Sequence, residues 1–269
     1  MGARDAGWIQ IYSENAQEMY DNLIQAVRIA EHPEVLLPIM VTMDGFIISH
    51  GMENVELLQD QVVRDFVGEY HFPYPLLDIE HPKTIGPLTL QDFYFEHKRE
   101  QAEAMQRSKA VITVIADDFA RLSGRQYGFV ECYKMKGAKY ALVVLGSTAG
   151  TAKYVVDELR QEGEQCGLVK IRVFRPFPGP ELCKALADIK AVGIMDRSDS
   201  FSTQGGPVFA ETKAALYQAS NQPKCVNYIY GLGGRDIEPS LIRQAFMEVK
   251  DLATSNAVGG GIRHLGVRE

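Results

Sequence analysis

The alternation of apolar and polar positions near the start of the chain predicts a strand, a helix and a second strand. Residues 8–12 have the composition of a strand, and a helix follows over residues 15–30, where apolar side chains recur every three or four positions. Asn15 and Glu18 have the spacing of a capping box, which marks the start of that helix. Residues 35–41 are almost continuously apolar, as is typical of a strand covered on both faces. This order of elements predicts a parallel α/β unit.

Two strands and one crossover helix are too few for a stable domain, because the sheet would keep an apolar edge and at least one uncovered face. We therefore expect the first segment either to dock onto another chain or to continue a domain whose other residues precede Met1. We also expect the purified chain to be poorly soluble, or partly disordered before about Thr89, and to regain order with its partners.

The middle of the chain combines an irregular stretch with a charged helix. A helix is predicted over residues 55–67, and residues 68–88 then form a proline-rich segment without a regular pattern. Loops longer than about 15 residues are uncommon inside a compact domain and are usually functional or interface-forming. A highly charged helix covers residues 91–107, with Thr89 as its cap, and its pattern allows it to continue towards Leu122.

The second half of the chain alternates short apolar runs with amphipathic stretches. The predicted strands cover residues 140–145, 168–174, 191–196 and 225–230. The predicted helices cover residues 149–162, 179–188, 206–219 and 238–252. Four strands that alternate with helices indicate a mostly parallel sheet with right-handed crossovers.

These patterns predict an α/β protein with two domains. The first domain covers residues 1–104 and includes the long linker and the charged helix, and the second covers residues 105–252. Residues 253–269, which include Gly259, Gly260 and Gly261, are expected to form a flexible tail.

Composition and charge exclude several classes of protein. The 269 residues carry a net charge of −7, with acidic and basic residues interspersed and no basic block of the nucleic-acid-binding type. No stretch approaches the roughly 18 continuous apolar residues of a membrane span, and the first residues lack the apolar core of a signal peptide. We therefore expect a cytoplasmic protein that binds neither nucleic acid nor membranes.

The metal-binding residue types do not form a motif. The four cysteines are too widely spaced for a C-x-x-C pair or an iron–sulfur run, and the six histidines form no ligand pair at helical spacing. We therefore expect no metal site on this chain, and any iron–sulfur cluster that its function needs must lie on another chain.

A candidate binding loop follows the second predicted strand. It contains Asp44, Gly45, Phe46 and His50, and it lies just after the carboxyl end of a parallel strand, where ligands bind in open α/β sheets. These four residues are the candidate cofactor-binding residues. A glycine-mediated turn with a solvated aspartate and histidine is an equally good interpretation, and both stay open.

Other loops favour structural roles. Residues 146–153 form a glycine-rich turn from a strand into a helix; a phosphate cradle is one interpretation, but the G-x-x-x-G spacing favours a tight turn capped by Ser or Thr. Residues 175–178 favour a rigid turn in which Arg175 makes an ion pair. The polar loops 196–207 and 231–236 favour contact with another subunit.

Several collinear segments carry a resemblance to a known family. They cover residues 4–10, 14–18, 37–40, 44–46, 49–50, 122–128, 146–153, 170–178, 196–198 and 230–236. In order and content they resemble the alpha subunit of pyruvate:ferredoxin oxidoreductase, also called pyruvate synthase, over nearly the whole chain up to about residue 252.

The resemblance implies a fold, a reaction and partners. The expected fold is part of a thiamine-diphosphate pyrimidine-binding domain followed by a transketolase C-terminal-like domain. The expected reaction is the reversible oxidative decarboxylation of pyruvate to acetyl-CoA with reduction of ferredoxin. The resemblance also implies thiamine diphosphate with Mg²⁺ at the interface with a beta subunit, gamma and delta subunits as further partners, and iron–sulfur clusters on other subunits.

The chain departs from the family pattern at its start. The front half of the pyrimidine-binding domain, which in the family carries the catalytic residues, does not precede residue 8, so no catalytic residue is assigned and the isolated chain is expected to be inactive. Two alternatives stay open. One is a related subunit for another 2-oxoacid or oxalate, and the other is a free-standing module that binds a nucleotide or flavin at residues 146–153.

Overall fold

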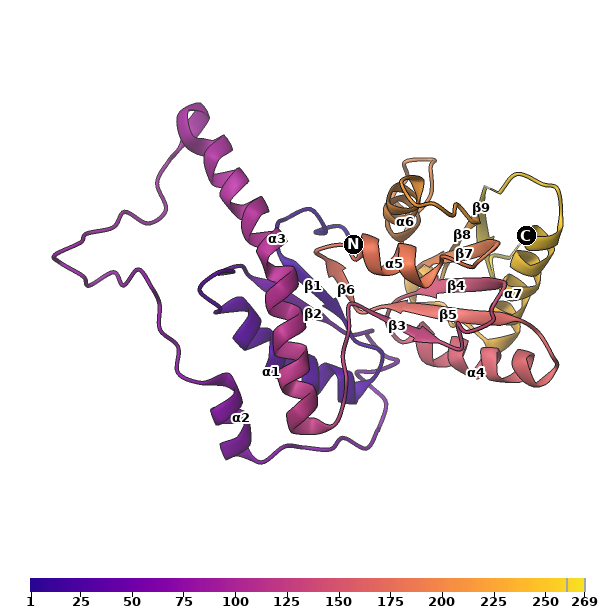
Figure 1. Ribbon diagram of the computed structural model, residues 1–269, viewed down its shortest axis with the longest axis horizontal. Coiled ribbons are helices and arrows are strands. Elements are labelled where there is room, and N and C mark those ends of the chain that lie inside the picture. Colours follow the sequence, from indigo (N-terminus) through magenta and orange to yellow (C-terminus); the bar gives the residue numbers. More distant parts are fainter. Residues whose placement is uncertain (260, 269) are drawn as a thin grey trace.

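The computed structural model describes residues 1–259 and 261–268, which form two β-sheets joined by the chain (Figure 1). The larger sheet belongs to the second half of the sequence. Its strands are β3 (Val130–Tyr133), β4 (Tyr140–Val144), β5 (Cys166–Ile171), β7 (Ala191–Asp196), β8 (Lys224–Tyr230) and β9 (Ile262–Leu265). They lie in the order β3-β5-β4-β7-β8-β9, and all neighbours are parallel except β3 and β5.

Helices cover both faces of the larger sheet. They are α4 (Thr148–Gln161), α5 (Gly179–Ala185), α6 (Pro207–Tyr217) and α7 (Pro239–Thr254). In β4, Tyr140, Leu142 and Val144 belong to the hydrophobic cluster with α4 and α7. Ala141 and Val143 belong to the cluster with α5 and α6. The near-continuous apolar run of this strand is therefore explained by burial on both faces.

The smaller sheet combines two strands from the first half of the chain with one from the second half. Its central strand is β1 (Ile9–Tyr12), which pairs in parallel with β2 (Ile39–Thr42) and antiparallel with β6 (Val173–Arg175). The predicted parallel α/β unit is confirmed, and α1 (Ala16–Ala30) begins where predicted, because Asn15 accepts a hydrogen bond from the Glu18 backbone N–H at 2.8 Å. The sheet has three strands rather than two, since β6 covers one edge of β1.

The predicted strand over residues 168–174 is divided between the two sheets. β5 ends at Ile171 and β6 begins at Val173, so Arg172 occupies the step between them. Arg172 is 2% exposed, and its guanidinium donates to Asn22 Oδ1 at 2.8 Å and Gln25 Oε1 at 3.2 Å, both on α1. The sequence shows one apolar run because both halves are buried, and it cannot show that they are buried in different sheets.

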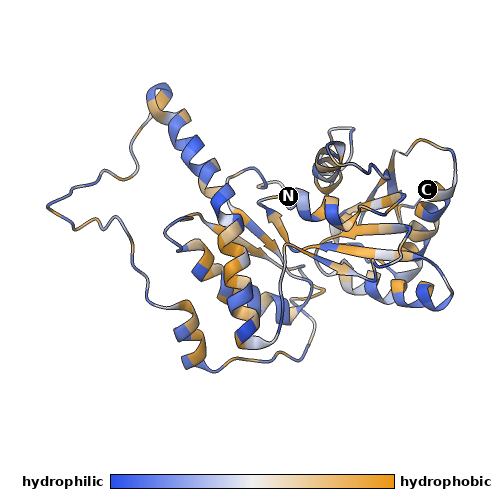
Figure 2. Cartoon of the chain, in the orientation of Figure 1, coloured by the Kyte–Doolittle hydropathy of each residue, from blue (hydrophilic) through white to orange (hydrophobic). Residues whose placement is uncertain are grey.

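Helix α3 (Leu90–Ser123) is one continuous helix, so it extends through the predicted domain boundary at residue 104. Its first half projects from the molecule after the irregular segment, and its second half passes over the smaller sheet (Figure 1). Figure 2 shows that the projecting half is mostly hydrophilic. Ile112 and Ile115 of the second half pack with Ile9 and Ile11 of β1. Within residues 1–259 and 261–268, no helix combines the length and apolar character of a membrane span.

Three predictions about the extent of elements are wrong. The strand predicted over residues 35–41 begins only at Ile39, because Leu36 adopts a left-handed backbone conformation (φ 46°) ahead of Pro38. The tail over residues 253–269 is not entirely flexible, because Ile262–Leu265 forms β9 at the edge of the larger sheet. Gly260 and Glu269 lie outside the described residues. The helix predicted over residues 55–67 is shorter, and α2 covers Asp60–Val67.

Candidate functional site

The carboxyl ends of strands from both sheets meet at one small pocket, which we call the interdomain pocket. Its volume is about 170 Å³. It is lined by Met1, Tyr12, Asp44, Leu145, Gly146, Asp196, Arg197, Ser198 and Val208. Four of the strands that border it, β1, β2, β4 and β7, point their carboxyl ends at it, which is the position where ligands bind in open α/β folds.

Asp44 is the one candidate binding residue that faces this pocket. Its carboxylate accepts a hydrogen bond from the Ser147 backbone N–H at 2.9 Å and a second, short one from the Ser147 hydroxyl. The predicted cap by Ser or Thr at residues 146–153 is wrong, because the side chain of the N-cap residue Ser147 makes no capping hydrogen bond to α4. The Asp44 carboxylate occupies the Ser147 N–H, one of the backbone donors that a phosphate would use, which weighs against the phosphate cradle.

The other candidate residues of the loop face outward. Gly45, Phe46 and His50 are exposed, and Phe46 is 77% accessible to solvent. The rings of Phe46 and His50 stack with centroids 4.5 Å apart and planes 12° from parallel. The structure thus separates Asp44 from the aromatic pair, although all of them lie on one short turn.

Arg197 is a residue of this site that sequence reasoning assigned only to a contact loop. Its Nη1 lies 3.3 Å from Asp44 Oδ2, yet it has no hydrogen-bond partner among the described residues, so the contact is an ion pair without hydrogen-bond alignment. The backbone of Gly231 packs on the Arg197 side chain, and a Cβ at Gly231 would lie 2.9 Å from Arg197 Nε. The guanidinium, whose Nη1 atom is buried, balances the charge of the Asp44 carboxylate, so the arrangement holds the loop rather than supplying a free acid or base.

Asp196 connects β7 to α6 at the edge of the interdomain pocket. It is fully buried and accepts hydrogen bonds from the backbone N–H groups of Val208 at 2.8 Å and Phe209 at 3.1 Å, and from Asn227 Nδ2 at 2.9 Å. Burial raises the pKa of Asp196 to about 6, because it disfavours the charged form more than these hydrogen bonds favour it.

This raised pKa predicts a measurable pH dependence. Because the folded-state pKa lies above the ordinary value of 3.8, the contribution of Asp196 to stability is greatest below about pH 4 and decreases as the pH rises through 6. We expect the free energy of unfolding of Asp196→Asn to lack this component. The difference between wild type and variant should therefore shift by about 2 kcal/mol between pH 4 and pH 7, in favour of the wild type at the lower pH. Denaturant titrations across this range measure it, and a difference independent of pH would contradict the assignment.

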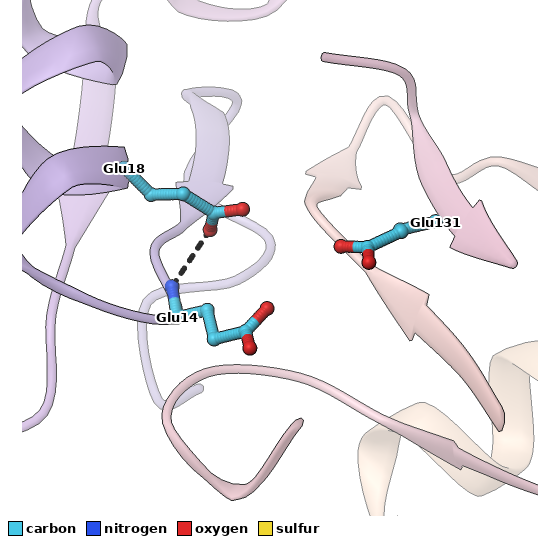
Figure 3. A group of neighbouring side chains, drawn as sticks. All are labelled: Glu14, Glu18 and Glu131. Atoms are coloured by element: carbon cyan, nitrogen blue, oxygen red, sulfur yellow. Dashed lines mark hydrogen bonds between the residues drawn. The ribbon is translucent and has the colours of Figure 1, made fainter. Parts of the chain in front are cut away.

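A second polar group lies between the two sheets, and we call it the Lys170 cluster. It consists of Lys170 on β5, Glu14 and Glu18 at the start of α1, and Glu131 on β3, whose three carboxylates point toward one another (Figure 3). Lys170 is 2% exposed, and its Nζ lies 2.6 Å from both Glu14 and Glu131. Lys153 reaches Glu14 and Glu131 from the more accessible side, at 2.8 and 2.7 Å.

The surrounding carboxylates explain why Lys170 stays charged although it is buried. Burial by itself would lower the pKa of Lys170, but the carboxylates of Glu18, Glu14 and Glu131 raise it above the ordinary value for lysine. Within residues 1–259 and 261–268, these glutamates are the only group of three or more His, Cys, Asp or Glu side chains whose ligand atoms lie close enough together to hold one metal ion. The Lys170 ammonium occupies the centre of that group, so the geometry favours an ion pair network over a cation site.

The residues present fit only part of a thiamine diphosphate site. The exposed Phe46 and His50 rings offer a flat surface on which an aromatic ring could stack. Asp44, the carboxylate of the same loop, is engaged by Ser147 and Arg197, and therefore does not offer a free ligand for Mg²⁺. The loop thus suits contact with the ring of the cofactor and not with a metal-bound diphosphate.

Comparisons with known proteins give the family. Residues 1–117 match the family described as pyruvate flavodoxin/ferredoxin oxidoreductase, thiamine diP-binding, and residues 138–242 match pyruvate:ferredoxin oxidoreductase core domain II. The chain is 51% identical over its whole length to the pyruvate synthase subunit PorA of Thermotoga maritima and covers 68% of that relative. It is 38% identical to the alpha subunit of NADH-dependent phenylglyoxylate dehydrogenase of Aromatoleum evansii, with 94% of this chain and 62% of the relative covered.

A solved structure supports the fold. The 2-oxoglutarate:ferredoxin oxidoreductase from Magnetococcus marinus superposes with a TM-score of 0.57 at 17% identity, over 89% of this chain and 42% of the other. The chain therefore spans about two thirds of its curated relatives and less than half of this structural relative. The predicted α/β class is confirmed, and the subunit interpretation is supported over a free-standing nucleotide or flavin module. The chain belongs to the family of the pyruvate synthase alpha subunit, PorA.

Proposed function

We propose that this chain forms part of the alpha subunit of a pyruvate:ferredoxin oxidoreductase. The enzyme would convert pyruvate and coenzyme A to acetyl-CoA and carbon dioxide while reducing ferredoxin, and would run reversibly. The observation that supports this most strongly is the 51% identity with a pyruvate synthase subunit along the whole chain. The match of residues 1–117 to a thiamine diphosphate-binding family supports the choice of cofactor.

The family resemblance suggests how the cofactor and the subunits share the reaction. When bound, thiamine diphosphate supplies the electron sink that decarboxylation of a 2-oxoacid requires. The loop with Asp44, Gly45, Phe46 and His50 would form one wall beside the cofactor ring, with the exposed aromatic pair toward it. A beta subunit would hold the diphosphate through Mg²⁺, and iron–sulfur clusters on other subunits, including delta, would carry single electrons, with gamma completing the complex.

A different 2-oxoacid is the second candidate. The relative from Aromatoleum evansii is named for phenylglyoxylate and is 38% identical to this chain over 260 residues. One subunit fold therefore occurs with more than one 2-oxoacid, and pyruvate is favoured here by the higher identity to the pyruvate synthase subunit.

The test is purification of the complex from the native host through a tag on this chain. We expect beta, gamma and delta subunits to copurify. With thiamine diphosphate, Mg²⁺, coenzyme A and a viologen acceptor, pyruvate should be oxidised faster than 2-oxoglutarate, phenylglyoxylate or oxalate. The isolated chain should show no turnover. Turnover by the isolated chain, or a preference for another 2-oxoacid, would contradict the proposal.

A further inference from the structure

The turn that carries Phe46 and His50 is anchored in the other half of the molecule. Asp44 lies at the start of this turn, directly after the smaller sheet, but its carboxylate contacts Ser147 at the start of α4 and Arg197 after β7. Both of these partners belong to the larger sheet and its helices. Asp44 therefore joins the candidate cofactor loop to the second domain through three contacts.

The start of α4, where Asp44 binds, has room and a favourable charge for a carboxylate from another part of the chain. Helix α4 has no acidic residue in its first turn and no side-chain cap of its own within the described chain, so the positive end of its dipole favours an external carboxylate, which Asp44 provides at the Ser147 N–H. Gly146 has φ 69°, and a Cβ there would lie 3.2 Å from Asp44 Oδ2. Glycine at this position therefore serves both the left-handed turn and the close approach of the carboxylate.

Hydrogen bonds within the turn connect the backbone of Asp44 to Phe46 and His50. The backbone carbonyl of Asp44 accepts from the N–H groups of Ile48 and Ser49, both at 3.4 Å, and the Phe46 carbonyl accepts from the His50 N–H at 3.1 Å. The Ser49 hydroxyl accepts from the Phe46 N–H at 2.9 Å. Because the turn is tied to the Asp44 backbone in this way, the orientation of the Asp44 side chain fixes where the Phe46–His50 stack points.

We propose that Asp44 is a positioning residue: its ion pair with Arg197 and hydrogen bonds to Ser147 let the second domain hold the Phe46–His50 turn in place for the cofactor. This inference rests on the proposed function, in which that turn faces the ring of thiamine diphosphate. Asp44 acts through the turn and does not itself touch the cofactor. The second domain then acts as a support for the first, rather than as a separate binding module.

The experiment uses the complete complex and compares Asp44→Asn with Glu14→Gln. Both changes neutralise one carboxylate that joins the two halves of the chain, but Glu14 pairs with Lys153 and Lys170 and does not contact the turn. Three quantities are measured for each: hydrogen exchange of the amides of residues 46–50, the thiamine diphosphate concentration that gives half-maximal activity, and the thermal midpoint.

For Asp44→Asn we expect amide exchange in the turn and the half-saturating cofactor concentration each to rise about tenfold. For Glu14→Gln we expect a lower thermal midpoint with both other quantities unchanged. Ser147→Ala, which removes only the hydroxyl donor, should change the same two quantities in the same direction by a smaller factor. It replaces Asp44→Asn as the test if that variant fails to assemble.

Two outcomes overturn the inference. Unchanged exchange in the turn means that Asp44 does not anchor it. Faster exchange with an unchanged cofactor requirement means that the anchored turn does not position the cofactor. Neither outcome bears on the choice of substrate. The rate of the wild-type complex with pyruvate tests the proposed function separately, so the failure of one can be distinguished from the failure of the other.

Discussion

Replacing Lys170 by methionine is expected to lower the free energy of unfolding by about 3–5 kcal/mol. Lys170 is almost completely buried and lies between the carboxylates of Glu14, Glu18 and Glu131. Methionine has a similar length and fills the space, but it leaves three carboxylates close together with too little compensating charge. Chemical denaturation at neutral pH, followed by circular dichroism, measures the change.

Lys153→Met is the matched control. Lys153 pairs with Glu14 and Glu131, but its side chain is 22% exposed, so solvent screens the charges that it leaves behind. We expect a loss of about 1 kcal/mol for this variant. Lowering the pH toward 4 should reduce the deficit of Lys170→Met, because protonation removes the repulsion among the glutamates. Equal losses for the two variants, or a deficit that does not depend on pH, would show that the buried charge is not the cause.

Replacing Gly193 by alanine is expected to destabilise the protein by about 3 kcal/mol through overpacking. Gly193 is on the central strand β7, where an added Cβ would lie 2.6 Å from Leu142 Cδ2, 2.8 Å from Val249 Cγ2 and 2.9 Å from Tyr228 Cε2. These atoms come from two neighbouring strands and from α7, and the valine and the tyrosine ring have little freedom to move. The midpoint of thermal or denaturant unfolding measures the cost.

Gly167→Ala provides the comparison for this prediction. Gly167 is also on a strand of the larger sheet, β5, but the atom closest to an added Cβ would be Met135 Sδ at 2.6 Å. A methionine side chain is unbranched and can rotate away. We expect a loss of about 1 kcal/mol, since the Lys134 carbonyl at 3.1 Å still limits the space. If Gly167→Ala costs as much as Gly193→Ala, the loss of stability does not depend on how rigid the atoms around the added Cβ are. Crowding would then not be the cause.

Regular periodicity allowed most elements of the second domain to be predicted. β7 was expected at residues 191–196 and lies at Ala191–Asp196, and α4 was expected at residues 149–162 and lies at Thr148–Gln161. Elements in a doubly covered parallel sheet have strong patterns, because apolar runs, glycine turns and amphipathic helices alternate. β3 and β9 were missed, because a short edge strand with partly exposed residues has no such pattern.

The candidate site was predicted only in part. The position of Asp44 after a parallel strand indicates that loop as a candidate site, and in the structure its carboxylate lines the interdomain pocket. Arg197 and Ser147 were assigned to loops more than 100 residues later in the sequence, and nothing in their local pattern indicates that they converge on one carboxylate. The charge of Lys170 within an otherwise apolar strand was a usable signal for a buried ion pair, because a lysine is rarely buried without partners.

The sequence by itself determined the α/β class, the start of α1 and the apolar strands of the larger sheet, because these depend on local periodicity and capping. Only the tertiary structure decided that one apolar run is divided at Arg172 between two sheets, that Lys170 meets three glutamates, and that Asp44 binds Ser147 and Arg197. Each of these contacts joins residues far apart along the chain. Their pairing depends on strand register within the larger sheet, in the case of Lys170 and Glu131, and otherwise on how the two halves of the chain pack, which no local pattern encodes.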